Sequence, residues 1–294
     1  MADLDDPIVA TNFGVGRPQE PITGTVKGAS QLDFGMQHRL SRIFGADGRT
    51  VMLAFDHGYF QGPTSGLERI DLNVVPLAEH VDALMATRGI IRSLVPANTN
   101  KALVVRASGG PSVLKELSDE RIAMNIEDAT RIDAAAVAVQ VFVGGEGETQ
   151  SIHNLTRLVD GGYRAGIPVL GVTAVGREIA RDARYLGLAT RMIAELGAQL
   201  VKTYYCEEDF AKVTSACPVP VIVAGGKKIS SFDALSMARR AVDEGADGVD
   251  MGRNIFQRES PAAMVQAVYA VVHGGVSAEE GLEMYRSLSN GAQD

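Results

Sequence analysis

The chain has 294 residues, of which 46% are hydrophobic and 22% charged, and its formal net charge is −8 at pH 7. This length suffices for one large core, and barrels of about 250 residues often form one domain. The acidic total and the lack of a Lys/Arg cluster argue against a nucleic-acid partner. No apolar run approaches the roughly 18 residues of a membrane span. The acidic start, Met1 to Asp6, lacks a signal-peptide pattern, so a cytoplasmic protein is expected.

The residues that commonly bind metals show no metal-ligand spacing. Cys206 and Cys217 are the two cysteines, and the five histidines are scattered along the chain. Neither pattern indicates a zinc site or a disulfide framework. We therefore expect no metal and no permanently bound cofactor.

The first 48 residues are predicted to form an arm and a helix that precede the main domain. Residues 1–30 are rich in Gly, Pro, Thr and Asp and show little periodicity, which predicts a loosely ordered arm and a potential subunit contact. From Leu32 to Phe44 the apolar residues recur at helical spacing. This helix could close the bottom of a barrel formed by residues 49–294.

From residue 51 onward, apolar strands alternate with segments of helical spacing. The eight predicted strands are Val51–Phe55, Val81–Thr87, Ala102–Arg106, Ala135–Val143, Pro168–Thr173, Gln199–Tyr205, Pro220–Ala224 and Ala246–Met251. One helix is predicted around Leu67–Leu77, and a last pair around Pro261–His273 and Ala278–Leu288. This alternation predicts a parallel sheet covered on both faces, and the count predicts an α/β fold, a closed (β/α)8 TIM barrel. A doubly wound open sheet is the alternative, but Asp56-His57-Gly58 after the first strand is not its glycine-rich dinucleotide turn.

Lys202 stands inside the predicted strand Gln199–Tyr205. A buried ammonium is costly, so such a lysine tends to lose its proton. A neutral amine in a dry pocket attacks carbonyl carbons, which makes Lys202 a candidate nucleophile. The structural alternative is a lysine at a solvated barrel mouth or one paired with a carboxylate.

Other polar residues gather at the predicted C-terminal strand ends, where barrels of this kind place their functional face. Those of the first, second and sixth strands are Asp56, His57, Arg88, Lys202, Tyr204 and Tyr205. Asp56 and His57 are a candidate acid/base pair, although a lone histidine is more often structural.

The loops after the seventh and eighth strands predict a phosphate site. Gly225, Gly226 and Lys227 follow the seventh strand, and Gly252 and Arg253 follow the eighth. In barrels these two loops commonly present backbone N–H groups to a phosphate. Glycine permits close backbone approach, and arginine supplies a forked charge. The alternative is two ordinary glycine turns.

Two further features each allow two interpretations. Cys206 is a candidate acyl-carrying nucleophile or an ordinary thiol. The loop Gly144-Gly145-Glu146-Gly147 is a candidate lid over the barrel mouth or a simple turn.

A buried lysine together with a sugar-sized phosphate site implies Schiff-base chemistry, because a protonated imine stabilises a carbanion on the neighbouring carbon. Four motifs together resemble the archaeal-type class I fructose-bisphosphate aldolase family over nearly the whole chain. They are Val51–Gly58, Val201–Tyr205, Ala224–Lys228 and Gly248–Asn254. The segments Met36–Phe44 and Asp56–Thr64 are similar to a CoA-dependent thiolase branch of that family.

The resemblance implies a role for each matching residue. Lys202 matches the Schiff-base lysine, and Asp56 matches the acid of the first strand, with His57 beside it. Gly225, Gly226, Gly252 and Arg253 match the loops that hold the substrate phosphate.

The thiolase branch implies a particular reaction, in which CoA is a co-substrate. It cleaves 3-hydroxy-5-phosphonooxypentane-2,4-dione with CoA to dihydroxyacetone phosphate and acetyl-CoA, in the degradation of autoinducer-2. No motif for the adenosine or pantetheine of CoA is recognisable. Family members are commonly large homo-oligomers, decamers among them, which implies a homo-oligomer here.

One position departs from the aldolase pattern. The aldolase branch has a proton-transferring tyrosine near the end of the fourth strand, and Phe142 is its counterpart here. A phenyl ring transfers no proton, which argues against ordinary aldol cleavage of fructose 1,6-bisphosphate or a related sugar phosphate. A catalytically silent phosphate-ligand binder is a third alternative, and a lysine buried opposite the phosphate loops argues against it.

Overall fold

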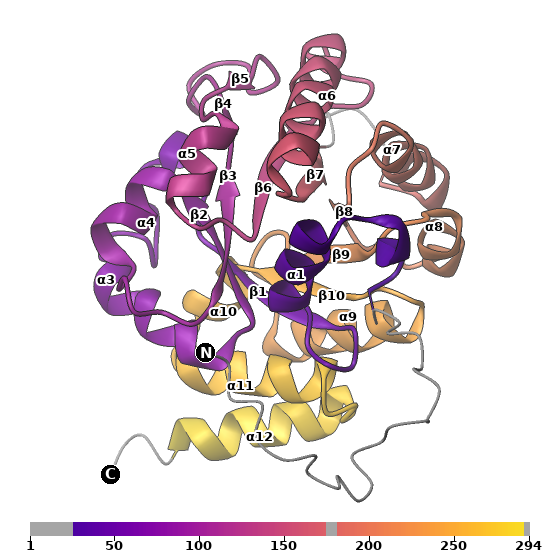
Figure 1. Cartoon of the computed structure of the whole chain (residues 1–294). Coiled ribbons are helices and arrows are strands. Elements are labelled where there is room, and N and C mark those ends of the chain that lie inside the picture. Colours follow the sequence, from indigo (N-terminus) through magenta and orange to yellow (C-terminus); the bar gives the residue numbers. More distant parts are fainter. Residues whose placement is uncertain (1–25, 175–180, 291–294) are drawn as a thin grey trace, which may run out of the picture.

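Eight parallel strands close into a barrel in the computed structural model, which describes residues 26–174 and 181–290 (Figure 1). The barrel strands are β1 (Thr50–Ala54), β2 (Ala83–Thr87), β3 (Ala102–Arg106), β6 (Ala136–Val141), β7 (Val169–Thr173), β8 (Leu200–Thr203), β9 (Val221–Ala224) and β10 (Gly248–Met251). They follow one another around the barrel in chain order, and β1 pairs with both β2 and β10. The predicted (β/α)8 barrel is therefore confirmed, and the doubly wound sheet is excluded.

Helices cover the outside of the barrel (Figure 1). They are α2 (Gly58–Gln61), α3 (Ile70–Asn73), η2 (Val75–His80), α4 (Arg88–Leu94), α5 (Ile126–Arg131), α6 (Glu148–Ala165), α7 (Ala183–Glu195), α8 (Phe210–Ala216), α9 (Ser231–Asp243), α10 (Arg253–Phe256), α11 (Pro261–Val272) and α12 (Ala278–Asn290). A small antiparallel pair, β4 (Ser108–Gly109) and β5 (Arg121–Ile122), lies in the connection after β3. No helix of the described ranges is long and apolar enough to cross a membrane.

The apolar core has two layers because successive strand residues point to opposite faces. The outer layer packs strand residues such as Val51 and Leu53 against the helices. The inner layer fills the barrel with Met52, Ala54, Ala83, Met85, Ala102, Val104, Ala136, Ala138, Leu170, Val172, Leu200 and Ile222. Charged residues that share this inward orientation are therefore forced into a confined space.

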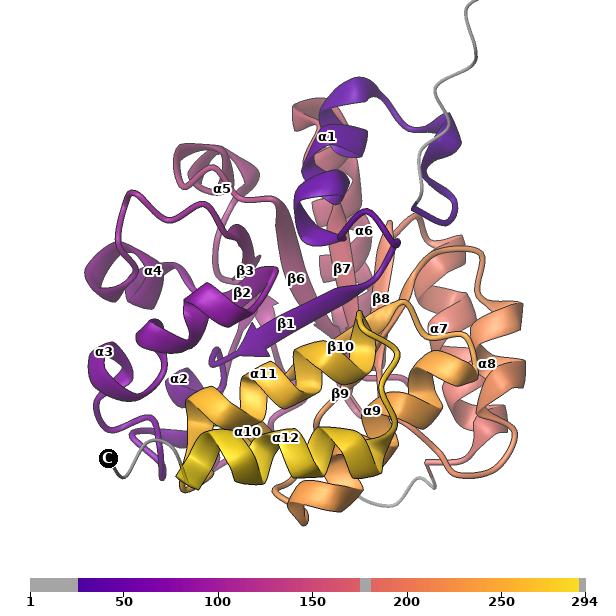
Figure 2. The same cartoon turned by 90° about the horizontal axis from the view of Figure 1, so that it is seen from below.

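Helix α1 (Phe34–Ile43) closes the end of the barrel at which the strands begin. The Asp33 carboxylate caps it by accepting a hydrogen bond from the Met36 N–H at 3.0 Å. Leu40 and Ile43 on its buried face, followed by Phe44, belong to the inner apolar layer. Figure 2 shows α1 above the barrel, beside the start of β1. The predicted helix and its position at the bottom of the barrel are both confirmed.

Two segments differ from the sequence expectations. The single helix predicted around residues 67–77 is divided into α3 and η2. Pro76 lies at the start of η2 and has no N–H to donate to the preceding turn, so the α-helix ends before it. Of the predicted arm, residues 1–25 lie outside the described residues. Beyond them, the Lys27 Nζ donates to the Thr214 carbonyl at 2.9 Å, and η1 (Ala29–Gln31) follows.

Candidate active site

A cavity of about 650 Å³ opens at the C-terminal ends of the strands. The structure brings most of the sequence-predicted residues to its lining: Asp56, His57, Phe142, Gly144, Gly145, Glu146, Lys202, Tyr204, Gly225, Gly226, Gly252 and Arg253. These residues come from different strands and meet because parallel strands all end at the same edge of the barrel.

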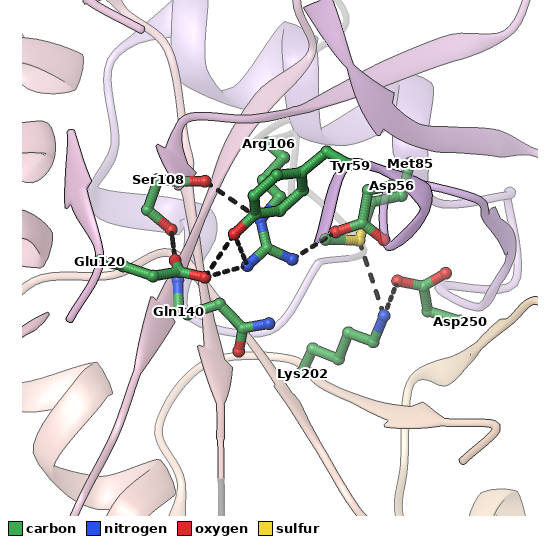
Figure 3. A network of polar contacts seen from close by, with 9 residues as sticks. All are labelled: Asp56, Tyr59, Met85, Arg106, Ser108, Glu120, Gln140, Lys202 and Asp250. Carbon is green, nitrogen blue, oxygen red and sulfur yellow. Dashed lines mark hydrogen bonds and ion pairs between the residues drawn. The ribbon is translucent and has the colours of Figure 1, made fainter. Parts of the chain in front are cut away.

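Lys202 lies inside the barrel at the base of this cavity. It is 8% exposed, and it faces inward from β8 in register with Val172 and Ile222. Its Nζ is 2.6 Å from the Asp250 Oδ2 and 3.6 Å from the Met85 Sδ (Figure 3). A lysine held by one carboxylate among apolar side chains can act as a carbonyl nucleophile once it has given up a proton.

Asp250 faces the same space from β10, with β9 between the two strands. It is 1% exposed, and within the described residues the Lys202 ammonium is the sole polar partner of its carboxylate. Burial raises the pKa of Asp250 to about 6, even though the nearby Lys202 charge acts in the opposite direction.

Arg106 is the centre of a second buried group of charges. It ends β3 and is 5% exposed. Its Nη1 donates to the Asp56 Oδ2 at 2.7 Å, its Nη2 to the Glu120 Oε1 at 2.5 Å, and its Nε to the Ser108 carbonyl at 3.1 Å. Figure 3 shows this guanidinium between the two carboxylates. Tyr59 and Ser108 hydroxyls also donate to Glu120, at 2.8 and 2.6 Å, so the network is extensively hydrogen-bonded.

The Arg106 guanidinium determines the charge of Asp56. Burial alone would raise the pKa of this carboxyl, but the positive charges of Arg106 and Lys202 outweigh burial and hold its pKa below the usual range. The two carboxylates in turn raise the pKa of Arg106, against the effect of its own burial. Asp56 is therefore a fixed anion at neutral pH.

His57 lines the cavity next to Asp56. Its ring stacks on Phe256 with 6.0 Å between the ring centroids, and its Nε2 is buried with no hydrogen-bond partner among the described residues. Burial lowers the pKa of His57, an effect that the Asp56 carboxylate opposes. The imidazole is therefore mainly neutral at pH 7.

The two glycine loops lie against each other at the rim. A Cβ on Gly252 would come within 2.2 Å of the Ala54 carbonyl oxygen, so only glycine fits there. Asn254, which is fully buried, donates from its Nδ2 to the Gly225 carbonyl at 2.5 Å and to the Lys227 carbonyl at 3.0 Å. This amide joins the loop after β9 to the start of α10. Together with Arg253 in the lining, the joined loops are suited to an anion.

Three predicted strand-end residues lie elsewhere. Arg88 begins α4, and its Nη1 pairs at 3.0 Å with the Asp128 Oδ2 on the outer surface. The Lys227 side chain is exposed and outside the cavity lining. Tyr205 follows the end of β8, and its hydroxyl donates to the Glu244 carboxylate at 2.7 Å. None of these three side chains lines the cavity, which the sequence pattern did not resolve.

The remaining candidates have clear positions. Cys206 is buried outside the cavity lining, and burial raises the pKa of its thiol, so it is no candidate for an acyl-carrying nucleophile. The loop Gly144–Gly147 contributes to the lining, but a Cβ on Gly147 would come within 2.0 Å of the Ser118 carbonyl oxygen. The end of the loop is therefore packed against the β4–β5 connection. Phe142 is half-buried and lines the cavity.

Sequence reasoning missed three charged residues of the site, namely Arg106, Glu120 and Asp250. Arg106 ends an apolar strand and obeys the same strand-end rule that identified Asp56. Asp250 lies within the apolar strand Gly248–Met251, where a buried carboxylate is as unusual as a buried lysine. Glu120 follows no strand of the barrel and lies in the irregular connection between β4 and β5. Within residues 26–174 and 181–290, no group of three or more His, Cys, Asp or Glu side chains is arranged to hold a metal ion.

The fold and this site define an enzyme of the aldolase class of (β/α)8 barrels. The family model of DeoC/LacD family aldolases matches residues 50–258. The chain belongs to this family.

Curated relatives match almost the entire chain. A protein of Enterobacter sp. (strain 638) is 58% identical over 99% of both chains, and a protein of Escherichia coli (strain K12) is 55% identical over 98% of this chain and 99% of its own. Both are named 3-hydroxy-5-phosphonooxypentane-2,4-dione thiolase. Among solved structures, an archaeal fructose 1,6-bisphosphate aldolase has a TM-score of 0.73 at 24% identity and covers 82% of this chain and 100% of its own. At that identity the structural match supports the fold.

Proposed function

We propose that this protein is a CoA-dependent thiolase that cleaves 3-hydroxy-5-phosphonooxypentane-2,4-dione to dihydroxyacetone phosphate and acetyl-CoA. Relatives with this name are 55–58% identical over nearly the full chain. The observation that carries the proposal is the position of Lys202, buried beside a carboxylate at the base of a cavity whose rim is suited to an anion.

Substrate binding follows from the two parts of the cavity. Gly226 and Gly252 offer backbone N–H groups to the phosphate, and Arg253 adds a positive charge. The Gly225 N–H donates to the Asp250 carbonyl at 3.1 Å, so Gly225 shapes the loop rather than binding the phosphate through its N–H. With the phosphate held there, the C4 ketone, which neighbours the phosphate-bearing carbon, is directed towards Lys202. Condensation of the amine with this ketone gives a protonated imine.

The imine then serves as the electron sink for carbon–carbon cleavage. The CoA thiolate adds to the C2 ketone, and the resulting alkoxide collapses to the thioester of acetyl-CoA. The C2–C3 bond breaks, and its electron pair moves into the C3–C4 bond as the iminium becomes an enamine. Protonation at C3 and hydrolysis of the imine release dihydroxyacetone phosphate and restore Lys202.

Phe142 at the cavity wall favours this reaction over aldol cleavage. Aldol cleavage needs a base that removes the proton from the substrate hydroxyl, and a phenyl ring has no group for it. In the thiolase reaction the alkoxide arises by addition of the thiolate, so no such proton has to be removed.

We also propose a homo-oligomer that acts in the cytoplasm, in the degradation of the signalling molecule autoinducer-2. Support comes from the family resemblance, in which decamers are common. Light scattering coupled to size exclusion tests this, because a decamer has ten times the 31.1 kDa mass of the chain.

The test of the activity compares two substrates. Acetyl-CoA should form from the phosphorylated pentanedione only when CoA is present, and Lys202→Ala should abolish it. Fructose 1,6-bisphosphate, assayed in parallel without CoA, should remain intact. Cleavage of the bisphosphate together with absence of acetyl-CoA would assign the protein to the aldolases that act on sugar phosphates, and ligand binding without any turnover would make it a binder.

A further inference from the structure

We propose that Asp250 is the proton carrier of imine formation: it takes the proton of the Lys202 ammonium and returns it to the carbinolamine hydroxyl. This inference rests on the proposed function of Lys202 as the imine-forming residue, and it deepens that function by assigning a catalytic group that the sequence pattern did not reveal.

The contact between the two residues is direct. The Lys202 Nζ and the Asp250 Oδ2 are 2.6 Å apart, within the range needed for proton transfer. Within the described residues, no other polar group engages either oxygen of Asp250. The carboxylate can therefore accept and release a proton without breaking a structural hydrogen bond.

Asp56, the other carboxylate near Lys202, is engaged differently. Its Oδ2 accepts a hydrogen bond from Arg106 at 2.7 Å, and this guanidinium is itself buried between Asp56 and Glu120. Protonation of Asp56 would disrupt a buried ion pair. We assign Asp56 as a fixed negative charge that positions Arg106 and balances the charge of Lys202.

The step balances in protons and electrons. Lys202 transfers one ammonium proton to Asp250, and the neutral amine adds to the C4 carbonyl carbon. The second nitrogen proton moves to the new alkoxide, which gives the carbinolamine. Asp250 then protonates the carbinolamine hydroxyl, the C–O bond breaks, water leaves, and the nitrogen lone pair forms the protonated C=N bond.

The electrostatics of the site agree with this role. The charged groups that face Asp250 are Lys202 from β8 and Asp56 beyond β1, and burial raises the pKa of Asp250 to about 6. A group that titrates near neutral pH can both accept and donate a proton during one turnover. The deprotonated form starts the step, so the rate of imine formation should rise with pH through this range.

The experiment measures the rate at which borohydride-trappable imine forms with dihydroxyacetone phosphate, by rapid quench and mass spectrometry. The test variant is Asp250→Asn. The control is Asp247→Asn, which changes a carboxylate just before the same strand, at the opposite end of the barrel, where its Oδ2 accepts from the Val221 N–H at 2.8 Å. Burial raises the pKa of Asp247 as well. The control therefore removes a buried carboxylate of raised pKa, as the test variant does, but one that does not contact Lys202.

We expect Asp250→Asn to slow imine formation by about 100-fold or more, the usual contribution of a general acid–base group. The rise with pH should be present in the unmodified protein and in Asp247→Asn, and absent in Asp250→Asn. Wild-type kinetics in Asp250→Asn, with imine still on Lys202, would overturn the role of Asp250 and leave the proposed function intact.

Two further outcomes separate the proposals. Absence of any imine on Lys202 in the unmodified protein would refute the proposed function itself. If Asp250→Asn fails to fold, the pH dependence of imine formation in the unmodified protein still tests the role of Asp250. A rate that does not change between pH 5 and 8 would contradict the assignment of Asp250 as the proton carrier.

Discussion

One cavity holds two buried groups of opposite charges, and the two differ in how completely they are hydrogen-bonded. Arg106 is held by Asp56, Glu120 and the Ser108 carbonyl. Lys202 has one carboxylate partner, Asp250, and otherwise contacts the sulfur of Met85. The first group has little freedom to change its protonation, whereas the second can exchange a proton without breaking a wider network.

The difference separates a structural role from a chemical one. A buried charge with all of its partners stabilises one arrangement and is costly to break. A buried lysine whose single carboxylate partner has a raised pKa has a neighbour that can take up a proton. Both groups are needed for one site, because the first fixes the charge of Asp56 beside the second. Changes to one group should therefore affect mainly stability and changes to the other mainly turnover.

The largest effect is expected for Lys202→Met, which should lower turnover at least about 10⁴-fold because the nucleophile is gone. Its effect on the free energy of unfolding should be small, about 1–2 kcal/mol, since Asp250 can take up a proton once its partner is lost. The sign with pH follows from the raised pKa of Asp250, so this variant should become more stable as the pH falls from 8 towards 5. Steady-state kinetics measure the turnover, and urea unfolding measures the stability. A loss of stability larger than that of Arg106→Met would contradict the assignment of a mainly chemical role to Lys202.

Arg106→Met should show the reverse pattern in stability. It leaves Asp56 and Glu120 buried without their cation, which costs about 3–5 kcal/mol in the free energy of unfolding. The control is Arg191→Met, where an exposed pair with Glu195 is removed and the cost should stay below about 1 kcal/mol. Equal losses in the two variants, by urea unfolding, would mean that the Arg106 network is not structural.

Arg253→Ala tests the anion site at the rim. Removal of one charge-assisted contact to a phosphate should raise KM for the phosphorylated substrate about 10- to 100-fold, corresponding to about 1.5–3 kcal/mol. The matched control is Lys227→Ala, because Lys227 carries the same charge but lies outside the cavity lining. A KM that changes equally in both variants would assign the effect to general surface charge.

The smallest effect concerns a third group of charges, at the opposite end of the barrel. His273 contacts Asp47 and Asp82, each at 2.9 Å. Burial alone would lower the pKa of His273, but the hydrogen bonds and charges of these carboxylates outweigh burial and raise it. A raised histidine pKa stabilises the fold fully below the unfolded value of about 6.5, and this contribution is lost as the pH rises through the folded value.

His273→Asn should therefore cost about 1–2 kcal/mol of unfolding free energy at pH 6 and less at pH 9, with turnover unchanged. Thermal unfolding across this pH range provides the measurement. A cost that does not vary with pH would show that the histidine contributes packing alone.

The strands and the central lysine could be predicted from the sequence because both depend on local patterns. An apolar run of four to six residues gives a strand, and Lys202 is conspicuous inside one. The eight predicted strands agree with the observed strands to within two residues at every end. The glycines after β9 and β10 could be assigned to a phosphate site from the strand count, because in such barrels the loops after the seventh and eighth strands commonly bind phosphate.

The partners of these residues could not be predicted, because they depend on closure of the barrel. Asp250 faces Lys202 only when β8 and β10 curve around the same axis. Arg106 joins Asp56 to Glu120 across segments far apart in the chain, and residues 107–123 show no periodicity that places Glu120. Arg88 lies outside the site because β2 ends at Thr87 and the next residue begins helix α4 on the outside of the barrel.

The most direct test of the role of Lys202 is to reduce the protein with borohydride in the presence of dihydroxyacetone phosphate and to map the modified peptide by mass spectrometry. We expect a single adduct on Lys202, formed only with the phosphate ester and lost in Lys202→Met. An adduct on another lysine, or full turnover without any adduct, would contradict the role of Lys202 at the centre of the site.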